Sequence, residues 1–83
     1  MSNRTYATGL GTQLRERRKL LRLNQTEVAD LAGTTQRTVS QVEAGKAANI
    51  GLYLDIAHVL GMQARFEPYE RPPSARPGAK STP

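Results

Sequence analysis

Residues 24–46 read NQTEVADLAGTTQRTVSQVEAGK, and the signals that decide the fold lie in this stretch. Asn24 is a helix N-cap residue, and Glu27, three positions later, completes the sequence pattern of a capping box. These two residues predict a short helix from about Gln25 to Ala32. Gly33 ends it, because glycine is the residue most often found just beyond a helix C-terminus.

A second short helix is predicted to follow directly. Thr34 and Thr35 form a capping pair and favour a helix from about Gln36 to Glu43. Ala44 and Gly45 then end that helix. Two short helices joined by a glycine-containing turn form the pattern of a helix-turn-helix.

The second of these helices has two chemically different sides. At 100° per residue, Val39 and Val42 lie close together on the side that must face a core. The opposite half carries polar side chains without a carboxylate: Gln36, Arg37, Ser40 and Gln41. Glutamine can make a bidentate contact with adenine and arginine with guanine, so this side suits the base edges of a DNA major groove. The alternative is an ordinary solvated helix surface.

Helices are also predicted on both sides of this pair. One spans about Leu10 to Arg22, and another is capped by Asn49 and ends at Gly61. Their apolar residues each share a face: Leu10, Leu14 and Leu21 in the first, and Leu52, Ile56, Val59 and Leu60 in the second. The sequence therefore predicts a mainly α-helical fold.

The period changes after Gly61. Met62, Ala64 and Phe66 alternate with Gln63, Arg65 and Glu67, which is a strand pattern. A strand needs a partner for its backbone groups, and no second strand pattern is found in the chain. We therefore expect residues 62–67 to pair with their own copy in a two-fold dimer. The alternative is an irregular extended segment packed on the helices.

Three regions are expected along the chain. Residues 1–9 are predicted to be a flexible arm, and residues 10–67 the folded domain. All five prolines lie at or after Pro68. Residues 68–83 contain too little apolar surface to offset the entropy of ordering, so we expect a disordered, basic tail.

The composition points to an acidic partner and away from catalysis. Twelve Lys and Arg against seven Asp and Glu give a net charge of +5, which favours nucleic acid. There is no cysteine, and the single histidine, His58, cannot assemble a zinc site alone. We expect no enzyme activity, cofactor or metal. Neither a membrane span nor a secretory signal is evident, so a cytoplasmic location is expected.

These motifs resemble the Cro/C1-type helix-turn-helix family of lambdoid phage repressors, over about residues 10–62. The residues that carry the resemblance are Gln25, Ala29, Gly33, Val39, Glu43, Gly45 and Lys46. It implies a compact lambda-repressor-like domain of four to five helices. It also implies a dimer that binds double-stranded DNA at a palindromic operator, with half-sites about 34 Å apart.

The resemblance also implies roles for individual residues. Base reading falls to Gln36, Arg37 and Gln41, and phosphate contact or positioning to Gln25, Thr35, Ser40 and Lys46. Arg18 would pair with Glu43 and tie the first helix to the end of the reading helix. Four further cations of the first helix face either phosphate or solvent: Arg15, Arg17, Lys19 and Arg22.

A single strand after the fourth helix, followed by a polar tail, is similar to HipB-type antitoxins. That similarity implies an autorepressor of its own operon that binds a kinase-like toxin. Leu20, Leu31 and Leu54 lie off the core stripes and leave apolar surface for a partner. The alternatives are a stand-alone phage-type or metabolic repressor without a toxin, and a protein-interaction adaptor that no longer reads DNA.

Overall fold

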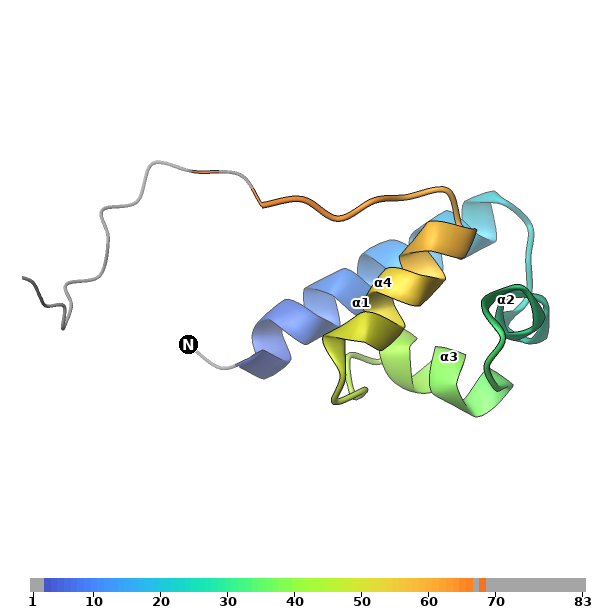
Figure 1. Ribbon diagram of the computed structural model, residues 1–83, viewed down its shortest axis with the longest axis horizontal. Coiled ribbons are helices and arrows are strands. Elements are labelled where there is room, and N and C mark those ends of the chain that lie inside the picture. The colour runs from blue at the N-terminus through green and yellow to red at the C-terminus, as the bar shows by residue number, and fades with distance from the viewer. Residues whose placement is uncertain (1–2, 67, 69–83) are drawn as a thin grey trace, which may run out of the picture.

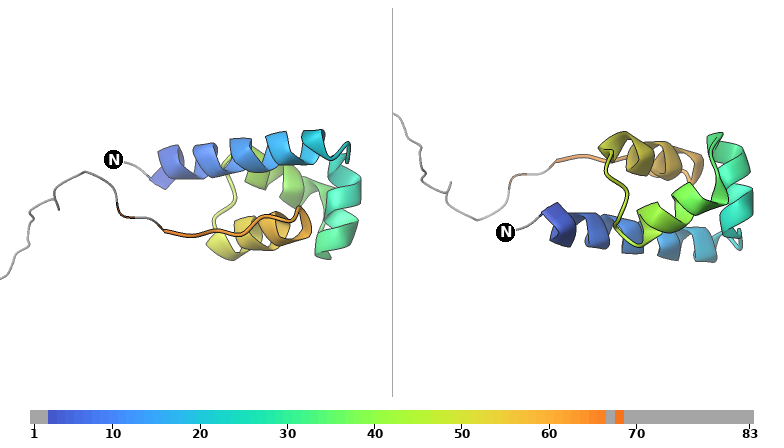
Figure 2. Two further views of the ribbon diagram at one scale, coloured as in Figure 1. Left: turned by 90° about the horizontal axis from the view of Figure 1, so that it is seen from above. Right: turned by 90° about the horizontal axis from the view of Figure 1, so that it is seen from below.

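The computed structural model describes residues 3–66 and 68, and the side chains from Ala7 onward. Four helices follow one another: α1 (Asn3–Leu20), α2 (Gln25–Ala32), α3 (Gln36–Glu43) and α4 (Ile50–Val59). α1 and α4 lie along one another, with α2 across one end and α3 on a single side (Figures 1 and 2). No strand is present among the described residues, and none of the described helices is long and apolar enough to cross a membrane.

The two central helices begin and end where their capping residues predict. The Asn24 side chain accepts from the Glu27 amide, and the Glu27 carboxylate accepts from the Asn24 amide, so the capping box is present. Gly33 adopts a left-handed conformation, with φ of 69°, at the end of α2. The Thr35 side chain accepts from the Thr38 amide at the start of α3.

One apolar core joins all four helices. Its buried residues are Leu14, Val28, Ala29, Val39, Val42, Tyr53, Ile56, Ala57 and Leu60. The leucine stripe predicted for α1 is only partly right, since Leu14 is buried whereas Leu10 and Leu21 are 38% and 40% exposed. Tyr53 was not predicted in the core. It fits there because its hydroxyl donates to the Ala47 carbonyl at 3.1 Å.

The prediction of a loose arm over residues 1–9 is wrong for residues 3–9, which belong to α1. Ala7 packs against the core, and a side chain at Gly11 would overlap the backbone carbonyls of Val42 and Glu43. Gly11 therefore allows α1 to lie directly against the end of α3. Residues 1 and 2 lie outside the described residues.

The chain after α4 has no regular secondary structure over residues 62–66. The strand expected there does not form within one chain, because no other described segment offers its backbone a partner. These residues lie on the side of the molecule opposite α3 (Figures 1 and 2). Glu67 and the tail beyond Pro68 lie outside the described residues.

Candidate nucleic-acid interface

The outward side of α3 carries the residues expected to read bases. Gln36, Arg37 and Gln41 are exposed, as are Thr35, Ser40 and Lys46 at or near the helix, whereas Val39 and Val42 are buried. The helix is thus apolar on the core side and polar without a carboxylate on the other. A surface of this kind presents donors and acceptors without repelling phosphate.

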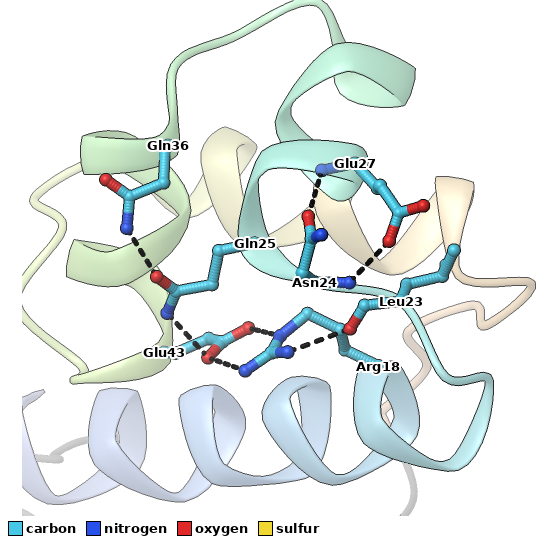
Figure 3. A network of polar contacts seen from close by, with 7 residues as sticks. All are labelled: Arg18, Leu23, Asn24, Gln25, Glu27, Gln36 and Glu43. Atoms are coloured by element: carbon cyan, nitrogen blue, oxygen red, sulfur yellow. Dashed lines mark hydrogen bonds and ion pairs between the residues drawn. The ribbon is translucent and has the colours of Figure 1, made fainter.

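A buried ion pair holds the end of α3 against α1 (Figure 3). Arg18 Nε donates to Glu43 Oε2 at 2.6 Å and Arg18 Nη2 donates to Glu43 Oε1 at 3.0 Å. Arg18 Nη1 also donates to the Leu23 carbonyl at 2.9 Å, just before α2. One guanidinium therefore connects α1, the turn that leads into α2, and α3.

The surroundings of the pair favour its charged form. Burial alone raises the pKa of the Glu43 carboxyl. Hydrogen bonds from Arg18 and Gln25, together with the charges of Arg18 and Arg15, outweigh burial and hold that pKa below its ordinary value. For Arg18, the hydrogen bond with Glu43 raises the pKa in spite of burial. Both groups stay ionised at neutral pH.

Gln25 connects the buried pair to the exposed side of α3. Its Nε2 donates to Glu43 Oε1 at 3.1 Å, and its Oε1 accepts from Gln36 Nε2 (Figure 3). Gln36 keeps its Oε1 and its second amide hydrogen for a further partner. The resemblance placed Gln25 at a phosphate. The structure adds that its side chain orients Gln36, a contact that depends on distances between α2 and α3.

Arg17, next to Arg18 on α1, also has a partner within the fold. Its Nε donates to the Leu60 carbonyl at 3.0 Å, at the C-terminus of α4. It thus satisfies a carbonyl that the helix end leaves open. Arg15, Lys19 and Arg22 are exposed.

Among the described residues, no group of three or more His, Cys, Asp or Glu side chains is placed to hold a metal ion.

The fold and the exposed side of α3 define a helix-turn-helix domain of the DNA-binding class.

Comparison with known proteins gives the family. The family profile described as helix-turn-helix matches residues 14–66, which is most of the chain. The chain belongs to this helix-turn-helix family, of Cro/C1 type, whose members are DNA-binding and typically non-enzymatic. A comparison with curated proteins finds no match.

Proposed function

We propose that the protein is a transcriptional repressor that binds a palindromic operator as a homodimer. The observation that carries this proposal is the exposed, carboxylate-free side of α3, anchored through Gln25 to a buried ion pair. Gln36, Arg37 and Gln41 read base edges. Thr35, Ser40, Lys46 and Gln25 contact phosphate or fix the helix on the duplex.

The geometry of Gln36 supports its role. One hydrogen of its Nε2 is used by Gln25, so the side-chain plane is set before DNA binds. Its Oε1 and remaining hydrogen then match the N6 and N7 positions of adenine. Arg37 follows on the same side and suits guanine O6 and N7. We expect an adenine and a neighbouring guanine in each half-site.

The test is to select bound duplexes from a random library and compare the parent with single alanine variants. Each of Gln36→Ala, Arg37→Ala and Gln41→Ala should lose about 1–3 kcal/mol of discrimination at one base position. Gln13 is an exposed glutamine of α1, so Gln13→Ala is the matched control and should keep the parent sequence preference. If all three α3 variants select the same sequences as the parent, the adaptor alternative replaces the repressor.

We further propose that residues 62–67 pair across the dimer and that the repressor is the antitoxin of a HipBA-type operon. Support for pairing comes from the position of residues 62–66, opposite α3, which leaves α3 free for DNA. Two apolar members of this segment also lack cover, since Ala64 is exposed and Phe66 is fully exposed, whereas Met62 packs against the core.

The toxin partner is tested by co-expression. The product of the neighbouring gene should co-purify with this chain. Its presence should not suppress the binding of this chain to any duplex. A neighbouring product that never co-purifies would favour the stand-alone repressor.

A further inference from the structure

The C-terminus of α4 has a turn that sets the direction of the chain after it. The Gly61 amide donates to the His58 carbonyl at 3.0 Å, and the Met62 amide donates to the Ala57 carbonyl at 2.9 Å. Gly61 has a φ of 74°, and these features together make a Schellman motif. Met62 then packs against the core, and residues 62–66 run back past the helices (Figure 1). The direction of these residues is therefore defined where they leave α4.

Arg17 of α1 holds this turn from outside α4. The two bonds of the motif use the carbonyls of His58 and Ala57 and not that of Leu60. Arg17 Nε donates to the Leu60 carbonyl at 3.0 Å. The same guanidinium lies beside Gly61, because a Cβ added there would be 3.4 Å from Arg17 Nη2. The half-buried Arg17 side chain therefore spans the two residues at which the chain turns.

Arg18, the next residue of α1, holds the end of α3 through its bonds to Glu43. Consecutive residues on a helix point about 100° apart, since 3.6 residues make one turn, so the two arginines contact different neighbours. α1 thus connects the end of α3 with the start of residues 62–66. A connection of this kind fixes the orientation of α3 relative to that segment.

We propose that Arg17 is a positioning residue that sets which half-site spacing the dimer accepts. This inference rests on the proposed dimer, in which residues 62–67 of two copies pair. The two α3 helices must then reach grooves about 34 Å apart, so a change of direction at Leu60 displaces the α3 helix of the second copy. Arg17 acts through the N–H of its Nε, and its charge is not required.

Substitutions of Arg17 separate its N–H from its charge. Arg17→Met keeps an unbranched side chain and removes both the N–H and the charge. Arg17→Gln also removes the charge, but its amide nitrogen lies as many bonds from the Cα as the Nε of arginine does. It can therefore still donate to the Leu60 carbonyl. Lys19→Met removes an exposed cation of the same helix and is the matched control.

The experiment compares two duplexes with identical half-sites, one with the spacing that the parent selects and one with a base pair added at the centre. The added pair moves the half-sites apart by about 3.4 Å and rotates one relative to the other about the DNA axis. The quantity measured is the ratio of the two affinities. A loss of phosphate contact or of stability affects both duplexes equally, so it cancels in this ratio.

The parent should prefer the selected spacing, and Arg17→Met should lower the ratio about 2- to 10-fold, which is the range for one hydrogen bond. Arg17→Gln and Lys19→Met should keep the parent ratio. An unchanged ratio in Arg17→Met would overturn the proposal. An equal loss in Arg17→Gln would also overturn it, since the charge and not the N–H would then matter.

Folding of the variants is checked by circular dichroism. Methionine, glutamine and leucine are good helix formers, so the parent helix content is expected in each variant. Arg17→Leu is a second variant without a donor, and it should lower the ratio as Arg17→Met does.

The experiment also separates this inference from the dimer on which it rests. A parent that binds both duplexes equally would overturn the proposed two-fold dimer on a palindromic operator. A parent with a clear preference that neither Arg17→Met nor Arg17→Leu lowers would overturn the role of Arg17 alone.

Discussion

Two regions of the chain carry equally clear sequence patterns: the helix-turn-helix of α2 and α3, and residues 62–66. The first forms the expected secondary structure within the chain, and the second does not. In α2 and α3 the apolar residues Val28, Val39 and Val42 are fully buried, and the polar side chains of Gln25 and Glu43 have partners. Residues 62–66 alternate apolar and polar side chains, but they form no strand, and Phe66 is fully exposed.

The difference lies in where each pattern finds its partner. A helix satisfies its own backbone and needs only a core for one side. A strand needs the backbone of another strand. The chain supplies a core for its helices, but its described residues include no second strand for residues 62–66 to pair with. Residues 62–66 therefore carry a strand pattern without a strand partner in the described part of the chain, and in the dimer proposed above the second molecule supplies one. Three experiments test this contrast.

The largest effect is expected inside the helical region. Glu43→Ala leaves the Arg18 guanidinium buried without its carboxylate. Breaking a buried pair in this way typically costs about 3–5 kcal/mol, so we expect a loss of that order in the free energy of unfolding. Urea denaturation followed by circular dichroism measures it. A loss below about 1 kcal/mol would mean that α3 does not depend on the pair.

The paired replacement Arg18→Met/Glu43→Leu is the control for charge burial. Removing both partners leaves no buried charge, and such exchanges are often neutral or stabilising. We expect the double variant to be more stable than Glu43→Ala. It lacks the Glu43 acceptor for Gln25, so its base preference should weaken at the position that we assign to Gln36 in the proposed complex.

A smaller effect of a different kind is expected at Phe66. Because this side chain is exposed in the single chain, Phe66→Ala should change the free energy of unfolding of the monomer by less than about 0.5 kcal/mol. Burying a phenylalanine stabilises an interface by about 1.5–3 kcal/mol. The two-fold dimer loses this side chain from both copies, so its dissociation constant should rise about 10²- to 10⁴-fold, as measured by analytical ultracentrifugation.

Two variants sharpen this result. Phe66→Leu keeps an apolar side chain and should weaken the dimer less than alanine does. A chain ending at Gly61 should keep its helical circular dichroism and sediment as a monomer. If that shortened chain still sediments as the same dimer, residues 62–67 do not form the interface, and the helices must supply it.

The parts of the fold predicted from the sequence are those set by neighbouring residues. Asn24, Thr35 and Gly33 act within a few residues of themselves, and the bounds of α2 and α3 were predicted from them. The predicted first helix began at Leu10, so residues 3–9 of α1 were missed. Gly11 is required by the close approach of α1 to α3, which a local pattern does not reveal.

The same division holds for the candidate site. The residues of the exposed side of α3 follow from helical spacing alone. The link from Gln36 through Gln25 to Glu43 depends on the packing of three helices. The positive φ of Arg22 was equally hidden, because nothing in the residue type indicates a left-handed backbone. Sequence patterns located the surface, whereas tertiary contacts determine how its side chains are held.

The smallest effect is expected from pH, through the carboxyl of Glu43. Burial opposes the hydrogen bonds and charges that lower its pKa, so the net stabilisation through this group is modest. Because the pKa in the folded protein lies below the ordinary value of 4.5, the unfolded chain binds the proton more readily. The stabilisation is complete above about pH 4.5 and is lost as the pH falls through the lower pKa of the folded state.

Urea unfolding between pH 7 and pH 3 measures this loss, and comparing variants assigns it to Glu43. Glu43→Gln removes the titrating group, so its stability should fall less between these pH values than that of the parent. Glu16→Gln removes an exposed carboxylate that forms no ion pair with a described residue, and it should fall as the parent does. An equal fall in all three proteins would show that acid acts elsewhere than at the contact between α1 and α3. The anchor of α3 would then be insensitive to acid.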